Sequence, residues 1–319
     1  MISRRRSFSC LNTNAQRLTK IIKDFLPNLN EITHKGQNGK IGIIGGSVEY
    51  TGAPYFAGMS ALRVGADLVH IFCCKEASIP IKSYSPELIV HPHLNNGLSQ
   101  IVSRLKDLHV ILIGPGLGRD TNIFQTVSKL IEECRALSKP LVIDADGLFL
   151  VSQKTELIRN YPGLILTPNY NEFARLVKAF LNKTIDLKSG IEESLVKELA
   201  ESIGEDVLVV CKGSVDVISC GTKDVKTIHC EMPGSGRRCG GQGDLLAGSL
   251  AVLSYWATSN VTDYHISLMA ACYAACSLVR QCNAVSYSKK GRGALTTDLL
   301  DEITLTFEKL YGDSSNIWV

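Results

Sequence analysis

The chain has 319 residues, of which 45% are hydrophobic and 20% are charged, and its formal net charge at pH 7 is +3. This composition is typical of a globular protein with one large core or two average ones. Lysine and arginine are dispersed without a basic, aromatic-rich stripe, which excludes a dedicated nucleic-acid-binding protein. No apolar run reaches the roughly 20 residues that a membrane span needs.

The first residues differ in composition from the rest of the chain. Arg4, Arg5 and Arg6 stand near the start, serine is frequent, and no acidic residue precedes Asp24. Arginine-rich, acid-poor beginnings are typical of organelle transit peptides, although a disordered basic tail has the same composition. We therefore predict a disordered or transit segment over residues 1–24, a single domain over residues 25–319, and a mitochondrial or cytoplasmic location.

After this segment, short apolar runs that end in glycine or polar residues alternate with longer helical stretches. The runs that we interpret as strands are Lys40–Ser47, Ala66–Cys73, Val110–Ile113, Pro140–Gly147, Gly163–Asn169 and Val207–Gly213. This alternation predicts an α/β fold with a doubly wound, mostly parallel central sheet and helices on both faces. In such sheets ligands bind beyond the carboxyl ends of the strands, so the polar loops are expected to gather at one edge.

Two further runs, Asp216–Cys220 and Val225–Glu231, lie too close together for a parallel crossover. They predict a hairpin, which makes the sheet mixed on that side. The two apolar stretches Leu245–Trp256 and Ile266–Gln281 predict buried helices.

The most informative stretch is the glycine-rich, basic loop from Gly234 to Gly243, which leads into the first of these helices. Successive glycines let backbone N–H groups approach an anion, and the positive end of a helix that begins near Gly243 would point to the same place. The one carboxylate there, Asp244, would repel a phosphate, but it suits the role of base for a substrate hydroxyl. The combination favours phosphoryl transfer, although an ordinary helix start also tolerates an aspartate.

Other strand ends carry polar residues with more than one interpretation. Lys212 could bind phosphate or lie in a surface turn; Asn169 with Glu172 could bind a ligand or cap a helix. Asp144 and Asp146 could act through magnesium or order a loop. The chain contains neither a correctly spaced dinucleotide fingerprint nor a P-loop, so the expected phosphate site is of another kind.

Taken together, the motifs resemble the ATP-dependent NAD(P)H-hydrate dehydratases, in their eukaryotic form. The matching segments run in order from Lys35 to about Leu310: Lys35–Ser47, Glu49–Ala57, Tyr84–Val90, Gly114–Arg119, Asp144–Leu148, Leu166–Asn169 and Arg237–Leu246. The resemblance implies a ribokinase-like fold. It also implies repair of NADHX and NADPHX, the hydrated forms of NADH and NADPH, by ATP-dependent phosphorylation of the S-epimer's ring hydroxyl and elimination of phosphate.

The resemblance further implies roles for individual residues, with Asp244 as the catalytic base that also contacts the substrate. The residues expected to bind ATP are Lys212, Gly213, Ser214, Val215, Asp216, Ser235, Gly236, Arg237, Arg238, Cys239, Gly240, Gly241, Gln242 and Gly243. Those expected to bind the hydrate are Gly118, Asn169, Tyr170, Asn171, Glu172, Phe173, Ala174 and Arg175. Magnesium (Mg²⁺) is expected on the ATP phosphates, with no protein ligand assigned. The two arginines could instead form a solvent-facing basic turn.

Two alternatives remain at this point. A ribokinase-like kinase for a vitamin precursor or sugar would share the glycine-rich loop and keep its phosphorylated product. A nucleotide-binding scaffold without turnover would have no need of Asp244. The expected partners are the small-molecule substrates and, functionally, a separate NAD(P)HX epimerase, since this length leaves no room for a fused one. No nucleic acid or membrane is expected, and the buried helices permit a homo-oligomer.

Overall fold

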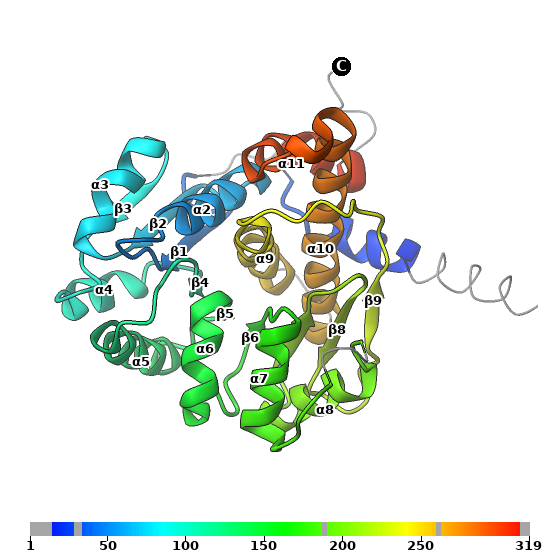
Figure 1. Ribbon diagram of the computed structural model, residues 1–319, viewed down its shortest axis with the longest axis horizontal. Helices are drawn as coiled ribbons and strands as arrows, with labels where there is room; N and C mark the ends of the chain where they lie inside the picture. The colour runs from blue at the N-terminus through cyan, green and yellow to red at the C-terminus, as the bar shows by residue number, and fades with distance from the viewer. Residues whose placement is uncertain (1–14, 29–33, 187–189, 260–262, 313–319) are drawn as a thin grey trace, which may run out of the picture.

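The computed structural model describes residues 15–28, 34–186, 190–259 and 263–312, and a nine-stranded sheet forms its centre. The strand order is β3-β2-β1-β4-β5-β6-β7-β8-β9 (Figure 1). The strands are β1 Lys40–Ile44, β2 Leu68–Phe72, β3 Ile89–His91, β4 Val110–Ile113, β5 Leu141–Ile143, β6 Leu164–Leu166, β7 Leu208–Cys211, β8 Asp216–Cys220 and β9 Ile228–Cys230.

The sheet is parallel from β3 to β7 and antiparallel from β7 to β9. The strands of the parallel part are short apolar runs, and β4, β5, β6 and β7 are buried along their whole length. Burial on both faces is what continuous apolar strands require. The prediction of a mostly parallel, mixed α/β sheet is therefore confirmed.

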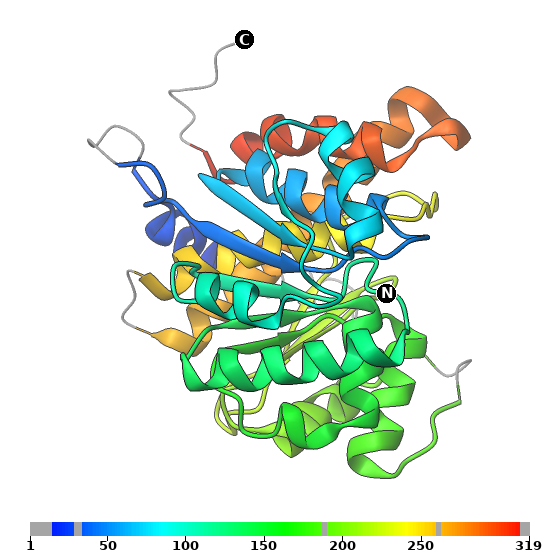
Figure 2. The same ribbon diagram turned by 90° about the vertical axis from the view of Figure 1, so that its left-hand side faces the viewer.

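Helices cover both faces of the sheet, which forms the middle layer in Figure 2. On one face α2, α9, α10 and α11 pack against one another, and α9 also packs on β4 and β5. On the other face α4 packs on α5, α6 on α7, and α7 on α8. Their bounds are α2 Gly52–Val64, α3 Lys75–Tyr84, α4 Leu98–Leu105, α5 Thr121–Ala136, α6 Ala145–Gln153, α7 Tyr170–Leu181, α8 Glu193–Ile203, α9 Gln242–Ser259, α10 Tyr264–Lys290 and α11 Thr296–Tyr311.

The order of the parallel strands places a switch point between β1 and β4. The chain runs outward from β1 to β3 and then returns to add β4 on the other side of β1. The loops that follow these two strands touch, because the Gly46 N–H donates to the carbonyl oxygens of Pro115 and Gly116, each at 3.1 Å. A crevice beyond the carboxyl ends of strands at such a point is the usual ligand position in doubly wound sheets.

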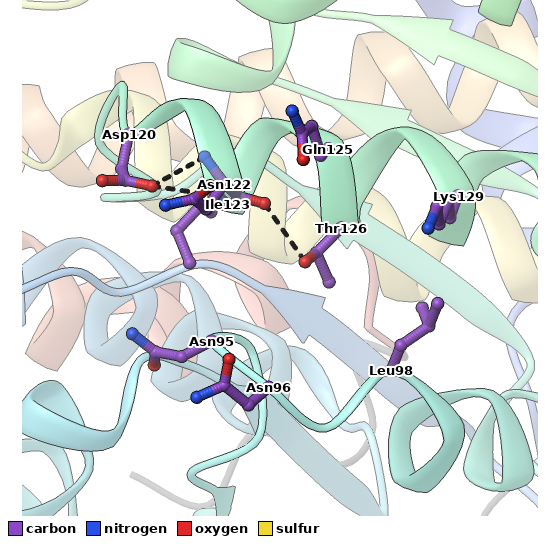
Figure 3. Close-up of a pocket in the computed structure, with 9 residues that line it drawn as sticks. All are labelled: Asn95, Asn96, Leu98, Asp120, Asn122, Ile123, Gln125, Thr126 and Lys129. Carbon is purple, nitrogen blue, oxygen red and sulfur yellow. Dashed lines mark hydrogen bonds between the residues drawn. The ribbon is translucent and has the colours of Figure 1, made fainter.

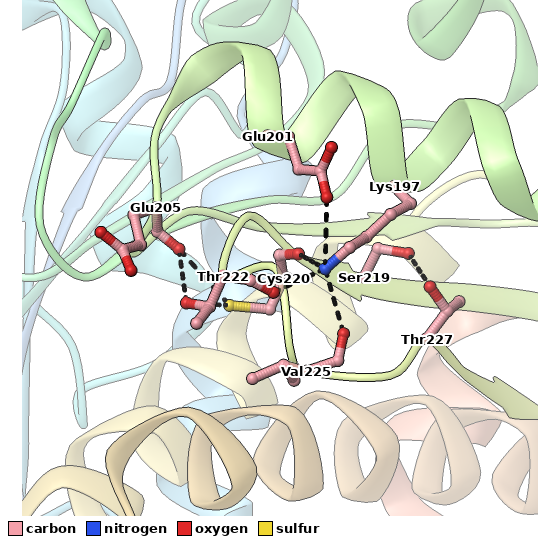
Figure 4. A network of polar contacts seen from close by, with 8 residues as sticks. All are labelled: Lys197, Glu201, Glu205, Ser219, Cys220, Thr222, Val225 and Thr227. Carbon is pink, nitrogen blue, oxygen red and sulfur yellow. Dashed lines mark hydrogen bonds and ion pairs between the residues drawn. The ribbon is translucent and has the colours of Figure 1, made fainter.

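One lysine of α8 donates several hydrogen bonds to the antiparallel hairpin (Figure 4). The Lys197 ammonium donates to the carbonyl oxygens of Cys220 at 2.8 Å, Thr222 at 2.6 Å and Val225 at 3.0 Å. Glu201, one turn further along the helix, lies 3.7 Å from the same nitrogen. A single cation thus donates to the end of β8 and to two carbonyl oxygens of the β8–β9 connection.

Part of the N-terminal basic segment belongs to the folded domain. Residues 15–25 are helical, and the side chains of Leu18, Ile22 and Phe25 are buried in the core. Their spacing of four and three residues gives the helix an apolar face, while its arginine and lysines stay exposed. The predicted boundary after residue 24 falls inside this helix; residues 1–14 lie outside the described part of the chain.

No described helix has both the length and the apolarity that crossing a bilayer requires.

Candidate active site

Three neighbouring strands bring predicted site residues to one edge of the sheet. Asp144 directly follows β5, Asn169 lies three positions after the end of β6, and Lys212 directly follows β7. These strands pair in parallel and in that order, so their carboxyl ends lie side by side. The N-terminus of α9 reaches the same edge, because α9 packs across β4 and β5. The sheet thus unites residues that lie up to a hundred positions apart.

A buried ion pair forms the floor of this site. Lys212 Nζ lies 2.7 Å from Asp144 Oδ1, and the side chains are 19% and 3% exposed. Burial works to lower the pKa of Lys212, but Asp144 and Glu172 raise it above its ordinary value. The lysine is therefore a fixed cation at the strand ends, and the surface-turn interpretation of Lys212 is wrong.

The glycine-rich loop lies directly over this pair. A Cβ atom added to Gly243 would lie 3.4 Å from Lys212 Nζ and 3.6 Å from Asp144 Oδ2. A side chain at Gly243 would thus contact both members of the pair, and glycine leaves that space free at the start of α9. Backbone N–H groups, a helix N-terminus and a lysine thus converge on one point, which is the requirement for binding a phosphate.

Asp244, the next residue, has the protonation behaviour of a base that works near neutral pH. Burial raises the pKa of Asp244 to about 7; Asp144 and Glu172 add to the increase, and Lys212 opposes it. A carboxyl group with a pKa near the working pH can accept a proton from a substrate hydroxyl and release it afterwards. These influences also show that the three carboxyl groups and the lysine act on one another as a cluster.

Asn169 and Glu172 form a capping box at the start of α7. The Asn169 side chain accepts from the Glu172 N–H at 3.0 Å, and Glu172 Oε2 accepts from the Asn169 N–H at 2.8 Å. The helix-capping interpretation is therefore confirmed. Burial raises the pKa of Glu172, with Asp144 adding to the increase and Lys212 opposing it, so this cap is electrically part of the cluster.

The two aspartates after β5 have separate roles. Asp144 pairs with Lys212, whereas Asp146 accepts from the Gly118 N–H at 3.2 Å and from Arg119 Nε at 3.1 Å. Ala145 between them has a φ of 48°, a left-handed conformation that costs a non-glycine residue roughly 1–2 kcal/mol. This strained residue separates the two carboxylates. Asp146 therefore orders the loop that carries Gly118, as one of the two interpretations predicted.

The predicted ATP-binding segments meet around one cavity. A space of about 190 Å³ is lined by Ser214 from the first segment, by residues of the glycine-rich loop and by residues of α10. The full lining is Ser214, Gly234, Ser235, Arg238, Gln242, Val279, Arg280 and Asn283. In the described part of the chain, no residue beyond their direct neighbours lies within 4 Å of a Cβ added to Gly236 or Gly240, so their backbone is open to a ligand.

Arg280 of α10 holds the first segment in place, a role the sequence analysis missed. Its guanidinium pairs with buried Asp216 at 2.7 Å and donates to the carbonyl oxygens of Ser214 at 2.8 Å and Gly213 at 2.9 Å. Asp216 in turn accepts from the Gly213 N–H at 3.0 Å. The signal available in the sequence was a lone arginine within an apolar helix, since a buried charge requires a partner.

Asn283, three residues further along α10, holds the glycine-rich loop. Its side chain accepts from the Ser235 N–H at 2.6 Å and donates to the Arg237 carbonyl at 3.0 Å. Arg237 itself donates to the carbonyl oxygens of Ala294 and Arg238, so its guanidinium serves the loop rather than solvent. Arg238 is exposed and lines the cavity, which leaves it available to a ligand.

The structure also shapes the second half of the loop. Gly241 has a φ of 97°, and a Cβ there would lie 2.8 Å from Thr296 at the start of α11. Thr296 donates to the Gly240 carbonyl and lies 3.3 Å from the Cys239 sulfur, while Gln242 donates to the same sulfur at 3.2 Å. Cys239 and Gln242 thus lock the loop onto α11.

Three predicted contact residues have their side chains engaged in the fold. Phe173 is fully buried in the core, because it faces inward on the amphipathic helix α7. The Tyr170 hydroxyl donates to the carbonyl oxygens of Asp186 and Gly190. The Asp216 carboxylate pairs with the Arg280 guanidinium. These three side chains thus have packing and positioning roles in the fold, and contact of these residues with a ligand stays a prediction. Asn171, Ala174 and Arg175 remain at least partly exposed on α7, and Val215 is partly exposed in its loop.

A second, larger cavity lies away from this chemistry. A space of about 630 Å³ between the starts of α4 and α5 is lined mainly by neutral side chains, with Asp120 and Lys129 as its charged residues (Figure 3). Asp120 is the N-cap of α5 and accepts from the N–H groups of Asn122 and Ile123. None of the predicted site residues lines this space, and it offers no base beside a cation.

The comparisons with known proteins identify a family and several similar proteins. Residues 41–305 match the model of a family described as NAD(P)H-hydrate dehydratase. The chain is 46% identical over 308 residues, 96% of its length, to the ATP-dependent (S)-NAD(P)H-hydrate dehydratase of Aedes aegypti, of which it covers 89%.

Solved structures with lower identity share the fold. A ribokinase-like superfamily protein from Enterococcus faecalis matches with a TM-score of 0.76 and 20% identity, covering 92% of this chain and 95% of that one. The ADP/ATP-dependent NAD(P)H-hydrate dehydratase from Bacillus subtilis, co-crystallized with ATP/Mg²⁺, matches with a TM-score of 0.66 and 22% identity, covering 92% and 97%. The predicted ribokinase-like fold is thereby confirmed.

Proposed function

The chain belongs to the NAD(P)H-hydrate dehydratase family, and on this premise we propose that it converts the S-epimer of hydrated NADH or NADPH back to the intact cofactor at the expense of ATP. The observation that carries the proposal is Asp244, a carboxyl group with a pKa of about 7 placed beside the Lys212–Asp144 pair at the N-terminus of α9. A base is thus held where a transferring phosphate would bind.

In the first step, the ring hydroxyl of the hydrate attacks the γ-phosphorus of ATP. Asp244 takes the hydroxyl proton as the new P–O bond forms, and the bond to the bridging oxygen breaks with its electron pair leaving on ADP. The Gly243 N–H and the Lys212 ammonium face the transferring phosphoryl group and stabilise the charge that spreads over its oxygens. Arg238 supplies a further cation at the mouth of the nucleotide cavity.

In the second step, the phosphorylated oxygen leaves the ring as phosphate with the C–O electron pair, and the neighbouring carbon loses a proton, which ends on the released phosphate. This restores the ring double bond. Phosphorylation is needed because hydroxide is a poor leaving group at neutral pH and phosphate is a much better one. The products are the reduced cofactor, ADP and inorganic phosphate, so no phosphorylated product accumulates.

Magnesium is part of the proposal through the nucleotide. Among the described residues, no three His, Cys, Asp or Glu side chains gather as a metal site, and Asp144 already pairs with Lys212. These residues fit an ion held mainly by ATP phosphates and water; bound there, magnesium would neutralise phosphate charge.

We also propose that the enzyme depends on a separate epimerase. A single chiral site takes one epimer of the hydrate, so the other epimer has to be interconverted by a separate epimerase. Assembly into a homo-oligomer stays a prediction, which analytical ultracentrifugation of the purified protein would test.

The test follows the absorbance band of reduced nicotinamide when protein, NADHX, magnesium and ATP are mixed, with an ATP-free control. We expect absorbance to rise only with ATP, matched by equal amounts of ADP and free phosphate. Binding of ATP without any rise would contradict the proposal and favour a kinase for another small alcohol. A stable phosphorylated product would likewise contradict the proposal and favour such a kinase.

A further inference from the structure

Beside the catalytic cluster, two arginines share one aromatic ring. The Arg119 guanidinium carbon lies 4.2 Å from the centre of the Phe149 ring, and that of Arg175 lies 5.1 Å from it. The three residues come from the loop before α5, from α6 and from α7, and Figure 1 shows α6 lying between α5 and α7. All three elements begin at the carboxyl edge of the sheet, so this aromatic-backed arginine pair belongs to the ligand-binding side.

The hydrogen-bonding capacity of both arginines is largely unused. Asp146 occupies only Nε of Arg119, whose side chain is 58% exposed. No described residue accepts a hydrogen bond from Arg175. Glu172, one turn before Arg175, lowers the local positive charge, but one of its oxygens is already bound to the Asn169 N–H. The terminal nitrogens of two guanidinium groups are therefore available to an anion.

The pair is linked to the catalytic cluster at both sides. Glu172 interacts electrostatically with Lys212 and Asp144 on one side and with Arg175 on the other. Arg119 directly follows Gly118, which Asp146 fixes through its backbone N–H. A substrate whose reacting hydroxyl lies at Asp244 would thus find the arginines further along the same edge.

Guanidinium forks match phosphate oxygens in geometry and charge, and a ring beneath them restricts their motion. We propose that Arg119 and Arg175, held over Phe149, bind the pyrophosphate of the dinucleotide substrate and so make the enzyme prefer a whole dinucleotide to its nicotinamide riboside half. This inference rests on the proposed function. It assigns the substrate's charged middle section to residues outside the catalytic cluster.

The experiment compares two substrates on the same variants. NADHX contains the pyrophosphate; the hydrate of dihydronicotinamide riboside keeps the ring hydroxyl and ribose but has no phosphate. For Arg119→Ala and Arg175→Ala we expect about a tenfold rise in the KM for NADHX, with kcat and the KM for ATP nearly unchanged. The double variant should lose most of the preference for NADHX, while turnover of the riboside hydrate stays at the wild-type level.

Arg159 provides a matched control. Its guanidinium also lies over a phenylalanine ring, that of Phe180 at 5.2 Å, but Arg159 precedes β6 and therefore lies at the opposite edge of the sheet. Arg159→Ala should leave the ratio of the two substrates unchanged. Arg175→Lys, which keeps the charge and loses the planar fork, should fall between wild type and Arg175→Ala.

Inhibition by ADP-ribose gives a second readout, because it contains the pyrophosphate without the reacting ring. We expect competition against NADHX that weakens in the double variant. An unchanged substrate ratio in the double variant, or ADP-ribose that competes only with ATP, would overturn the arginine assignment. Failure of the wild-type protein to convert NADHX at all would instead overturn the proposed function.

Discussion

Asp244 is expected to set the pH dependence of the reaction. Because burial and the nearby carboxylates raise its pKa to about 7, the base is protonated and inactive below that pH. The kcat/KM for NADHX should therefore rise with pH and level off above about 7. Asp244→Asn should lower kcat by about 10²–10⁴-fold and remove this rise. A variant with near-normal turnover would contradict the mechanism.

The same residue should make the protein less stable as pH increases. Between about pH 4 and pH 7 the folded protein keeps the Asp244 proton, whereas the unfolded chain has released it. Because the unfolded state then binds fewer protons, the free energy of unfolding falls as pH rises through this range, from about pH 4 to about pH 7. Asp244→Asn should consequently raise Tm more at about pH 8 than at about pH 5. Exposed Asp224→Asn serves as the control and should shift Tm little at either pH.

Arg280 is expected to act on ATP binding through the segment that it holds. Arg280→Met removes its bonds to Asp216, Ser214 and Gly213, which should raise the KM for ATP at least tenfold while the KM for NADHX changes little. Arg280→Lys keeps the pair with Asp216 and should recover part of the ATP affinity. Thermal shifts at increasing ATP concentration check this directly. An equal rise in both KM values would indicate a general loss of structure instead.

The residues at this site divide by how far their partners lie along the chain. Asn169 and Glu172 stand three positions apart, so their capping box was predicted from local spacing. Asp244 was found because the glycines that surround it are its neighbours. Arg280 contacts residues more than sixty positions away, and the apolar helix around it carries no local signal for its partners. Contacts that depend on tertiary packing were the ones missed.

At the scale of elements, α9 carries Asp244 and depends on a close contact with α2. A Cβ added to Gly248 would lie 2.0 Å from the Ala57 carbonyl oxygen, where backbone cannot move aside. Alanine normally stabilises a helix relative to glycine by about 1 kcal/mol. Here Gly248→Ala should instead lower the free energy of unfolding by about 1–3 kcal/mol or more through overpacking, and kcat should fall as Asp244 shifts.

Urea unfolding and steady-state kinetics check this prediction. Gly293→Ala is the control, because no described residue other than its chain neighbours has an atom within 4 Å of the added Cβ. A stabilised Gly248→Ala variant would show that α2 and α9 can separate without cost.

The strands illustrate which elements sequence patterns can predict. The strands β1, β2, β4, β5, β6 and β7 are mainly apolar, and all were predicted. The bounds of β4 were predicted as they stand, whereas the other predicted runs extended beyond the strand ends. The edge strand β3 spans only Ile89–His91 and was not predicted as a strand. β3 pairs with β2 at the edge of the sheet. With only three residues it is too short to show the alternating or continuous apolar pattern that indicates a strand.

For the whole molecule, the N-terminal helix of residues 15–25 is expected to be required for stability. Burial of a side chain such as Leu18, Ile22 or Phe25 contributes roughly 1.5–3 kcal/mol, and domains are stable by only about 5–15 kcal/mol in total. Removing residues 1–14 should leave Tm and activity unchanged. Removing residues 1–25 should give a protein that unfolds or precipitates. Ile22→Asp should be strongly destabilising, whereas Lys20→Asp at an exposed position should not be.

The same helix limits where a transit peptide could end. We propose that an organelle address is carried before residue 15, since cleavage within the helix would remove side chains from the core. Residues 1–14 fused to a fluorescent reporter should then direct it to mitochondria, and mass spectrometry of the protein recovered from cells should find a mature N-terminus at or before Ala15. If the reporter stayed in the cytosol, the basic residues would have no targeting role. A mature N-terminus beyond Phe25 would contradict the stabilising role of the helix.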